Sequence, residues 1–163
     1  MKKQPIVEIY TDGACAGNPG PGGYGVVLKF KNLTKELSGG FSLTTNNRME
    51  LMAVIKGLEA LKIPCRVILY SDSQYLINSV TKGWLEKWRK NGWRRTSKEP
   101  VKNVDLWKKL LSLTSRHEIT WRWVKGHAEN LYNNRCDFLA TEALKKTPLP
   151  PDVGYCPDEQ LEE

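Results

Sequence analysis

The chain has 163 residues, of which 40% are hydrophobic and 26% charged, and its formal net charge is +7. This length and composition are typical of one globular domain. A domain of this size buries roughly 70% of its unfolded surface, so it needs no disulfide or structural metal to fold. No apolar run approaches the roughly 20 residues of a membrane span, and the Met1–Pro5 start leads directly into a strand-like segment. We therefore expect neither a membrane anchor nor a secretory signal. Four cysteines without CxxC spacing favour a reducing, cytoplasmic compartment.

The positive charge is concentrated in one segment. Residues 82–109 contain ten basic and three acidic residues, so this segment alone carries the net charge of the whole chain. A basic segment of this kind indicates a polyanionic partner, most often a nucleic acid, although many such segments are only solvated surface. Residues 148–163 contain five acidic residues, no basic ones and several prolines, and we expect this tail to be disordered.

Apolar periodicity predicts the secondary structure. Residues 6–11 alternate as in a half-buried strand, and residues 66–71 form the nearly continuous apolar run of a strand covered on both faces. The predicted elements, in chain order, are strands at 6–11, 24–30 and 34–43, a helix at 47–63, a strand at 66–71, helices at 74–82 and 104–115 with a basic segment between them, a strand at 118–124 and a helix at 131–146. With a further helix in the basic segment, the order is β-β-β-α-β-α-α-α-β-α. We predict an α/β fold with a mixed five-stranded sheet, three antiparallel strands followed by parallel ones, flanked by helices.

A glycine-rich run, Gly20–Gly25, matches the pattern G-x-G-x-x-G. A dinucleotide site requires that this run open a helix whose N-terminus holds the pyrophosphate. Here Pro21 lies inside the run and a predicted strand follows it. We interpret the run as a connection between antiparallel strands.

Four acidic residues lie where predicted elements begin or end. Asp12 and Asp72 end strands, Glu50 lies in the first turn of the long helix, and Asp137 lies near the start of the last helix. Each has a simpler interpretation: a turn at Asp12, a helix cap at Asp72, a capping box at Glu50 and helix-dipole stabilisation at Asp137. As a set they indicate more, because ligands gather at the carboxyl ends of strands, and Asp12 and Asp72 are neighbours if their strands pair.

Such a cluster of carboxylates favours a cation. Carboxylates held together raise one another's pKa values unless a cation neutralises them, and all-oxygen ligation suits Mg²⁺ or Mn²⁺ rather than zinc. Two such ions can activate a water and stabilise the leaving oxygen in phosphodiester cleavage. His127, in the loop before Asp137, is either a surface residue or a general acid, whereas the second histidine, His117, has no functional context.

Six segments in this order resemble the bacterial ribonuclease H family of type 1: Tyr10–Cys15, Gly17–Gly20, Thr44–Leu51, Tyr70–Tyr75, Trp123–His127 and Asn134–Asp137. The resemblance extends from about residue 6 to residue 146. It implies a ribonuclease H-like catalytic domain over residues 1–147, a basic protrusion at about 82–103, and the acidic tail 148–163 outside the shared motifs. It also implies Mg²⁺-dependent hydrolysis of the RNA strand of RNA/DNA hybrids, which leaves 5′-phosphate and 3′-hydroxyl ends.

The resemblance assigns roles to individual residues. Asp12 would bridge two Mg²⁺ ions, which Mn²⁺ could replace, while Glu50 and Asp72 complete one site and Asp137 the other. His127 would assist proton transfer or product departure. Residues that would bind the hybrid are Cys15, Asn18, Asn46, Asn47 and Gln74 beside the site, Thr45 and Asn103 at a DNA-strand phosphate, and Trp84, Lys87, Trp88, Arg89, Lys90, Arg94 and Arg95 in the basic protrusion. On spacing alone, Trp84 and Trp88 fit packing against the core better than contact with nucleic acid, so we expect some tryptophans of this segment to be buried and one to line the DNA path.

Two alternatives stay open at this point. A non-catalytic hybrid-binding module would have no use for four carboxylates, which weaken phosphate binding. A related nuclease or strand-transfer enzyme acting on DNA would not need the Thr44–Asn47 segment and Asn18, where the family reads ribose. We therefore expect a hybrid-cleaving enzyme that acts as a monomer, with no membrane association and no obligate protein partner.

Overall fold

The computed structural model describes residues 4–96, 99–125 and 130–157. Within these ranges it contains one five-stranded sheet and five helices, which confirms the predicted α/β class and element order. The elements are β1 (Ile6–Cys15), β2 (Gly20–Phe30), β3 (Leu33–Thr44), α1 (Asn46–Glu59), β4 (Arg66–Ser71), α2 (Gln74–Thr81), α3 (Trp84–Lys90), α4 (Val104–Thr114), β5 (Glu118–Trp123) and α5 (Leu131–Leu144). None of the helices in the described ranges has the length and apolar character that crossing a membrane requires.

The sheet has the order β3-β2-β1-β4-β5. The first three strands form an antiparallel meander, while β4 pairs with β1, and β5 with β4, in parallel. The predicted end of the first strand at Asp12 is wrong, because antiparallel pairing with β2 continues to Cys15, which lies opposite Gly22. The glycine-rich run is accordingly part of β2 itself and not only a connection between strands.

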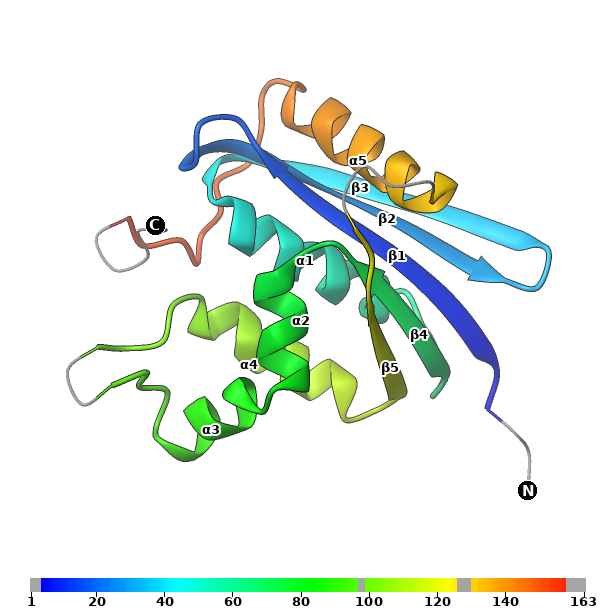
Figure 1. Cartoon of the computed structure of the whole chain (residues 1–163). Coiled ribbons are helices and arrows are strands. Elements are labelled where there is room, and N and C mark those ends of the chain that lie inside the picture. Colours follow the sequence, from blue (N-terminus) through cyan, green and yellow to red (C-terminus); the bar gives the residue numbers. More distant parts are fainter. Residues whose placement is uncertain (1–3, 97–98, 126–129, 158–163) are drawn as a thin grey trace.

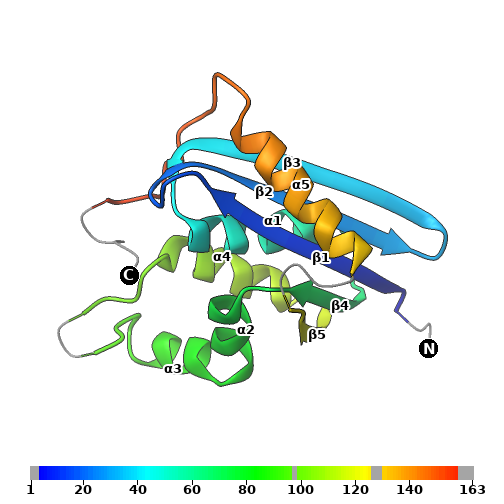
Figure 2. The ribbon, with the colours of Figure 1, turned by 45° about the horizontal axis from the view of Figure 1, so that its top comes forward.

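Helices cover the two faces of the sheet differently (Figures 1 and 2). Helix α5 lies across β1, β2 and β3 on one face, while α1 packs on the opposite face with α2 and α4 beside it. The core lies under α1, where Leu51 and Ile55 pack among buried side chains of the sheet such as Ile9 and Val26. Burying each such side chain contributes roughly 1.5–3 kcal/mol to folding, so α1 is held firmly against β1.

The C-terminal segment departs from expectation. Residues 148–157 follow α5 around the end of the sheet and reach the N-terminal end of α1 (Figure 1). The backbone N–H of Ser42 donates to Pro150 O at 2.9 Å, and Asp152 is buried, at 9% exposure. The prediction of disorder is therefore wrong for residues 148–157. Composition misled here because the acidic Asp152 has a buried cationic partner, Arg48, which the tail's own sequence does not reveal. Residues 158–163 lie outside the described residues.

Candidate active site

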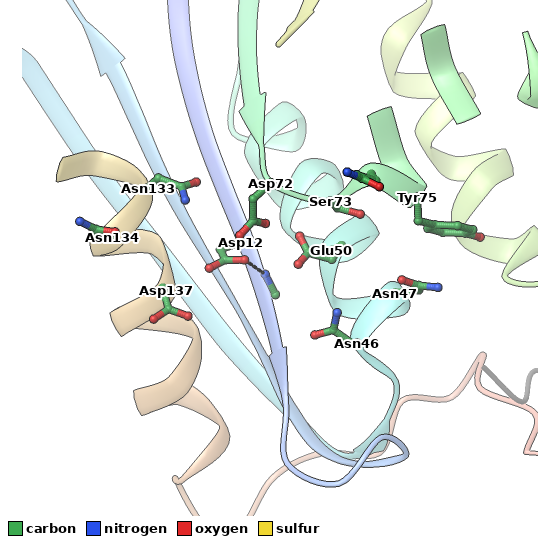
Figure 3. A pocket seen from close by; sticks show the side chains of 12 residues that line it. Asp12, Asn46, Asn47, Glu50, Asp72, Ser73, Tyr75, Asn133, Asn134 and Asp137 are labelled. Atoms are coloured by element: carbon green, nitrogen blue, oxygen red, sulfur yellow. Dashed lines mark hydrogen bonds between the residues drawn. The ribbon is translucent and has the colours of Figure 1, made fainter. Parts of the chain in front are cut away.

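Three carboxylates meet at one end of the sheet. Oxygen atoms of Asp12, Glu50 and Asp72 all lie within 4.8 Å of one another. The three side chains turn toward one another in Figure 3, from β1, from the first turns of α1 and from the residue after β4. Asp12 and Glu50 are 5% and 4% exposed, so two of the three carboxylates have little access to water.

Strand register and a glycine bring these carboxylates together. Tyr10 of β1 pairs with Tyr70 of β4, so Asp12 and Asp72 each follow two residues beyond paired positions of neighbouring parallel strands. A Cβ at Gly13 would lie 2.6 Å from the backbone nitrogen of Glu50. Because glycine has no side chain, α1 can approach β1 at Gly13 closely enough for Glu50 to face Asp12.

The local capping interpretations fail for Glu50 and Asp72. The N-cap of α1 is Thr45, whose Oγ1 accepts a hydrogen bond from the Arg48 N–H at 3.3 Å, and Glu50 Oε2 has no partner among the described residues. Ser73 caps α2 by accepting from the Leu76 N–H at 3.1 Å. Both carboxylates are thus directed to the cavity and not to helix ends.

Asp137 completes one side of the same cavity from α5 (Figure 3). It lies well inside that helix, whose N-cap is Asn130, so stabilisation of the helix dipole does not explain its position. A Cβ at Gly25 of β2 would lie 2.2 Å from the carbonyl oxygen of Cys136. Close contact between α5 and this glycine therefore positions the turn that carries Asp137.

Burial and mutual repulsion shape the electrostatics of the cluster. Burial, followed by the charges of Asp72 and Asp137, raises the pKa of Asp12 far above its ordinary value. Burial and the neighbouring charges of Asp12 and Asp72 raise the pKa of Glu50 in the same direction. A group of carboxylates whose pKa values rise together lacks a counter-charge, and a divalent cation supplies one.

The cluster lies in a cavity of about 390 Å³. Its lining residues are Asp12, Gly13, Asn46, Asn47, Glu50, Asp72, Ser73, Gln74, Tyr75, Asn133, Asn134 and Asp137. The site residues predicted from sequence therefore include all four carboxylates, Asn46, Asn47 and Gln74 among those that line it. Ser73, Tyr75 and Asn133 were missed, and so was a role for Asn134. Asn133 and Asn134 lie four and three residues before Asp137, a helical spacing that places them on its face and could have identified them.

Other predicted hybrid-binding residues lie around this cavity. Asn18, in the connection between β1 and β2, is tied to the start of α1, because its Oδ1 accepts from the Asn46 N–H at 2.9 Å. The Cys15 thiol is half-buried and donates to the Thr44 carbonyl at 3.4 Å. Thr45 and Asn103 are each only 1% exposed and serve as the N-cap residues of α1 and α4. Their contact with a phosphate stays a prediction.

The basic segment extends away from the sheet with α3 (Figure 1). Its predicted binding residues Lys87, Arg89, Lys90, Arg94 and Arg95 are all exposed. Trp88 is half-buried and packs on the core, with its ring centroid 6.0 Å from that of the buried Trp107, while Trp84 is 41% exposed. The packing alternative therefore holds for Trp88, whereas Trp84 is exposed and has Lys82 Nζ over its ring, 5.8 Å from the centroid.

His127, the predicted proton-transfer residue, lies outside the described residues.

Comparisons with known proteins agree on one family. The sequence profile of the RNase H family matches residues 4–145. Among curated relatives, the ribonuclease H of Syntrophus aciditrophicus is 61% identical over 152 residues, which are 93% of this chain and 88% of that protein. The ribonuclease H of Shewanella loihica is 62% identical over 147 residues, which are 90% of this chain and 92% of that protein.

Solved structures give the same result. LC9-RNase H1, described as a type 1 RNase H with the type 2 active-site motif, superposes with a TM-score of 0.80 at 31% identity, over 89% of this chain and 74% of that one. LC11-RNase H1, solved in complex with an RNA/DNA hybrid, superposes with a TM-score of 0.62 at 26% identity, over 85% of this chain and 96% of that one.

Proposed function

The chain belongs to the ribonuclease H family and is an endoribonuclease, and we propose that it cleaves the RNA strand of RNA/DNA hybrids at the cavity lined by its four carboxylates. The observation that carries this proposal is the meeting of Asp12, Glu50 and Asp72 within 4.8 Å at the end of β1 and β4. The 2′-hydroxyl distinguishes the RNA strand from the DNA strand, and the products would carry 5′-phosphate and 3′-hydroxyl ends.

The carboxylates fit divalent metal ions, and Mg²⁺ is the ion we propose. The donors are all oxygen atoms, and one of them, Glu50 Oε2, is buried with no partner among the described residues. Asp12, Glu50 and Asp72, whose oxygens lie within 4.8 Å of one another, would hold one ion, and Asp12 with Asp137 of the same cavity would hold a second, as the family resemblance implies. Bound there, Mg²⁺ supplies positive charge that lowers the pKa of a water and stabilises the leaving oxygen.

The remaining residues bind and orient the hybrid. The side chains of Asn46, Asn47 and Gln74 line the cavity beside the carboxylates, and their amides both donate and accept hydrogen bonds, as recognition of a ribose hydroxyl requires. His127 would give a proton to the leaving 3′-oxygen, a general-acid role that histidine fills near neutral pH. Because one chain supplies the whole cavity lining, we propose that the enzyme acts as a monomer. Its cytoplasmic location stays a prediction.

A single assay tests the proposed function. Labelled RNA/DNA hybrid, single-stranded RNA, duplex RNA and duplex DNA are incubated with the protein, with Mg²⁺ or with chelator. We expect Mg²⁺-dependent cutting of the RNA strand of the hybrid alone. Binding of the hybrid without cutting would instead support a non-catalytic module, and cutting of duplex DNA at a comparable rate would support a DNA nuclease.

A further inference from the structure

A buried arginine ties the start of α1 to two distant segments. The Arg48 side chain is fully buried and forms ion pairs with two carboxylates. Its Nη1 and Nη2 donate to Asp105 of α4 at 2.8 and 2.7 Å, and its Nε and Nη2 donate to Asp152 of the C-terminal segment at 2.7 and 3.0 Å. Such bidentate, charge-assisted pairs fix the orientation of the guanidinium as well as its charge.

Asp152 also holds the residue on the other side of the helix cap. Thr44, the last residue of β3, donates from Oγ1 to Asp152 Oδ2 at 2.7 Å, and both side chains are buried. The same carboxylate therefore binds Thr44 and Arg48. Between these two residues lie Thr45, Asn46 and Asn47, and the last two line the cavity.

The segment that carries Asp152 is fitted closely into this place. A Cβ at Gly154 would lie 2.0 Å from Asp105 Oδ2 and 2.8 Å from Arg48 Nη2. The backbone at Gly154 thus lies directly against the ion pairs, and there is no space for a side chain at this position. The Tyr155 N–H donates to the Asp152 carbonyl at 3.1 Å, which closes a turn around the same residue.

From this geometry we infer that Asp152 is a positioning residue for the hybrid. By holding Thr44 and Arg48 together, it sets the turn that presents Asn46 and Asn47 to the ribose of the substrate. The inference rests on the proposed function and deepens it, because it makes residues 148–157 part of the substrate-binding apparatus. Displacement of a binding group by about 1 Å can cost about a hundredfold in rate, so a small relaxation of this turn is measurable.

Two variants test this link in the full-length protein. Asp152→Asn keeps the shape of the side chain but replaces one carboxylate oxygen, a hydrogen-bond acceptor, with an NH2 group. That group would face donors of Arg48 or Thr44. Thr44→Val replaces the hydroxyl with a methyl group of similar size and leaves both members of the Asp152–Arg48 pair in place, so it tests the same link without an uncompensated buried charge. Val67→Ala is the matched control, because Val67 is equally buried but lies at the far end of β4 from the cavity.

The readouts separate positioning from stability. They are the KM and kcat for hybrid, the ratio of hybrid to duplex-DNA affinity measured in chelator, and the unfolding temperature. We expect Asp152→Asn to raise KM about five- to tenfold and to lower the affinity ratio, with kcat changed less, and Thr44→Val to act in the same direction by about threefold. Val67→Ala should lower the unfolding temperature and leave KM and the affinity ratio at their wild-type values.

The inference would be overturned if Thr44→Val keeps the wild-type KM and affinity ratio, and if Asp152→Asn keeps them as well where it folds. This holds whatever the stability of the two variants. That result leaves the proposed function intact so long as the wild-type protein cuts hybrid with Mg²⁺. Failure of the wild-type protein to cut hybrid would refute the proposed function itself.

Discussion

Asp12 and Asp72 lie at equivalent heights on neighbouring parallel strands, each two residues beyond the paired Tyr10 and Tyr70. Parallel pairing of β1 and β4 is therefore what turns two aspartates 60 positions apart in the sequence into one cluster. Glu50 joins them because α1 crosses β1 at Gly13, where no side chain intervenes. The cluster therefore depends on three elements of the fold, β1, β4 and α1.

The first prediction concerns Asp12→Asn, which keeps the size of the side chain and removes its charge. Because Asp12 is the carboxylate shared by both proposed ions, Mg²⁺-dependent cleavage should fall by much more than tenfold, which corresponds to about 1.4 kcal/mol of transition-state stabilisation. Hybrid affinity in chelator should not fall. Glu36→Gln serves as the control, since Glu36 pairs with Arg135 on the surface and should leave cleavage unchanged. Retention of a tenth or more of wild-type activity by Asp12→Asn would contradict the assignment.

A second prediction follows from the raised pKa of Asp12, which burial and the charges of Asp72 and Asp137 move to about 8. The folded protein therefore holds a proton that the unfolded chain loses near pH 4. Between these values the folded state binds more protons, so its stability in chelator should fall as the pH rises from about 4 to about 8. Each kcal/mol lost lowers the unfolding temperature by roughly 2–4 °C.

Mg²⁺ should oppose this loss, because it binds the ionised carboxylates. Thermal unfolding is measured at several pH values with chelator and with Mg²⁺, and the stabilisation by Mg²⁺ should be larger at pH 8 than at pH 5. Asp12→Asn in chelator should show a weaker dependence on pH than the wild-type protein. A wild-type unfolding temperature that rises with pH in chelator would show that the cluster is not destabilised by its own charge.

Much of the fold and site could be predicted from local patterns. Apolar periodicity locates α1 and β4, and the positions of Asp12 and Asp72 at strand ends predict that they meet if the strands pair, as they do. Asp137 joined the predicted set because it lies near the start of the last helix, and the resemblance to ribonuclease H added its role at a second ion. These features depend on residues near one another in the sequence or on a motif shared with the family.

The role of the C-terminal segment could not be predicted in the same way. Asp152 and Arg48 lie 104 positions apart, and neither carries a local signal that names its partner. An acidic, proline-rich composition is typical of disorder when its charges are solvated. Here one of those charges is buried against an arginine, and the backbone contact between Ser42 and Pro150 holds the same segment against the sheet.

The third prediction compares the two carboxylates that hold Arg48. The Asp152 side chain is 4% exposed, whereas that of Asp105 is 42% exposed, so water can replace Asp105 but not Asp152. Asp152→Asn should lower the free energy of unfolding by about 2–3 kcal/mol, because it leaves buried donors of Arg48 and Thr44 poorly matched. Asp105→Asn should cost about 1 kcal/mol or less. Denaturant unfolding measures both, and equal losses would show that burial does not distinguish the two pairs.

The last prediction divides the basic segment by its ion pairs. Arg89 and Arg95 are each paired with a nearby glutamate, Glu86 and Glu99, whereas Lys87, Lys90 and Arg94 have no ion pair among the described residues. A phosphate must compete with the glutamates for the first two but not for the other three. Per residue replaced, alanine at Lys87, Lys90 and Arg94 should therefore raise KM for hybrid more than alanine at Arg89 and Arg95. It should also flatten the salt dependence of binding more, since each lost phosphate contact removes roughly 0.7–0.9 from the log–log slope.

Turnover at saturating hybrid should change little in either variant, because these residues act on binding and lie outside the cavity that holds the carboxylates. The unfolding temperature should also hold, since exposed substitutions usually change stability by about 0.5 kcal/mol or less each. KM and binding affinity are measured across a series of salt concentrations for the wild-type protein and both variants. An unchanged slope in the triple variant would show that the charge of this segment is solvated surface and that the hybrid is held elsewhere.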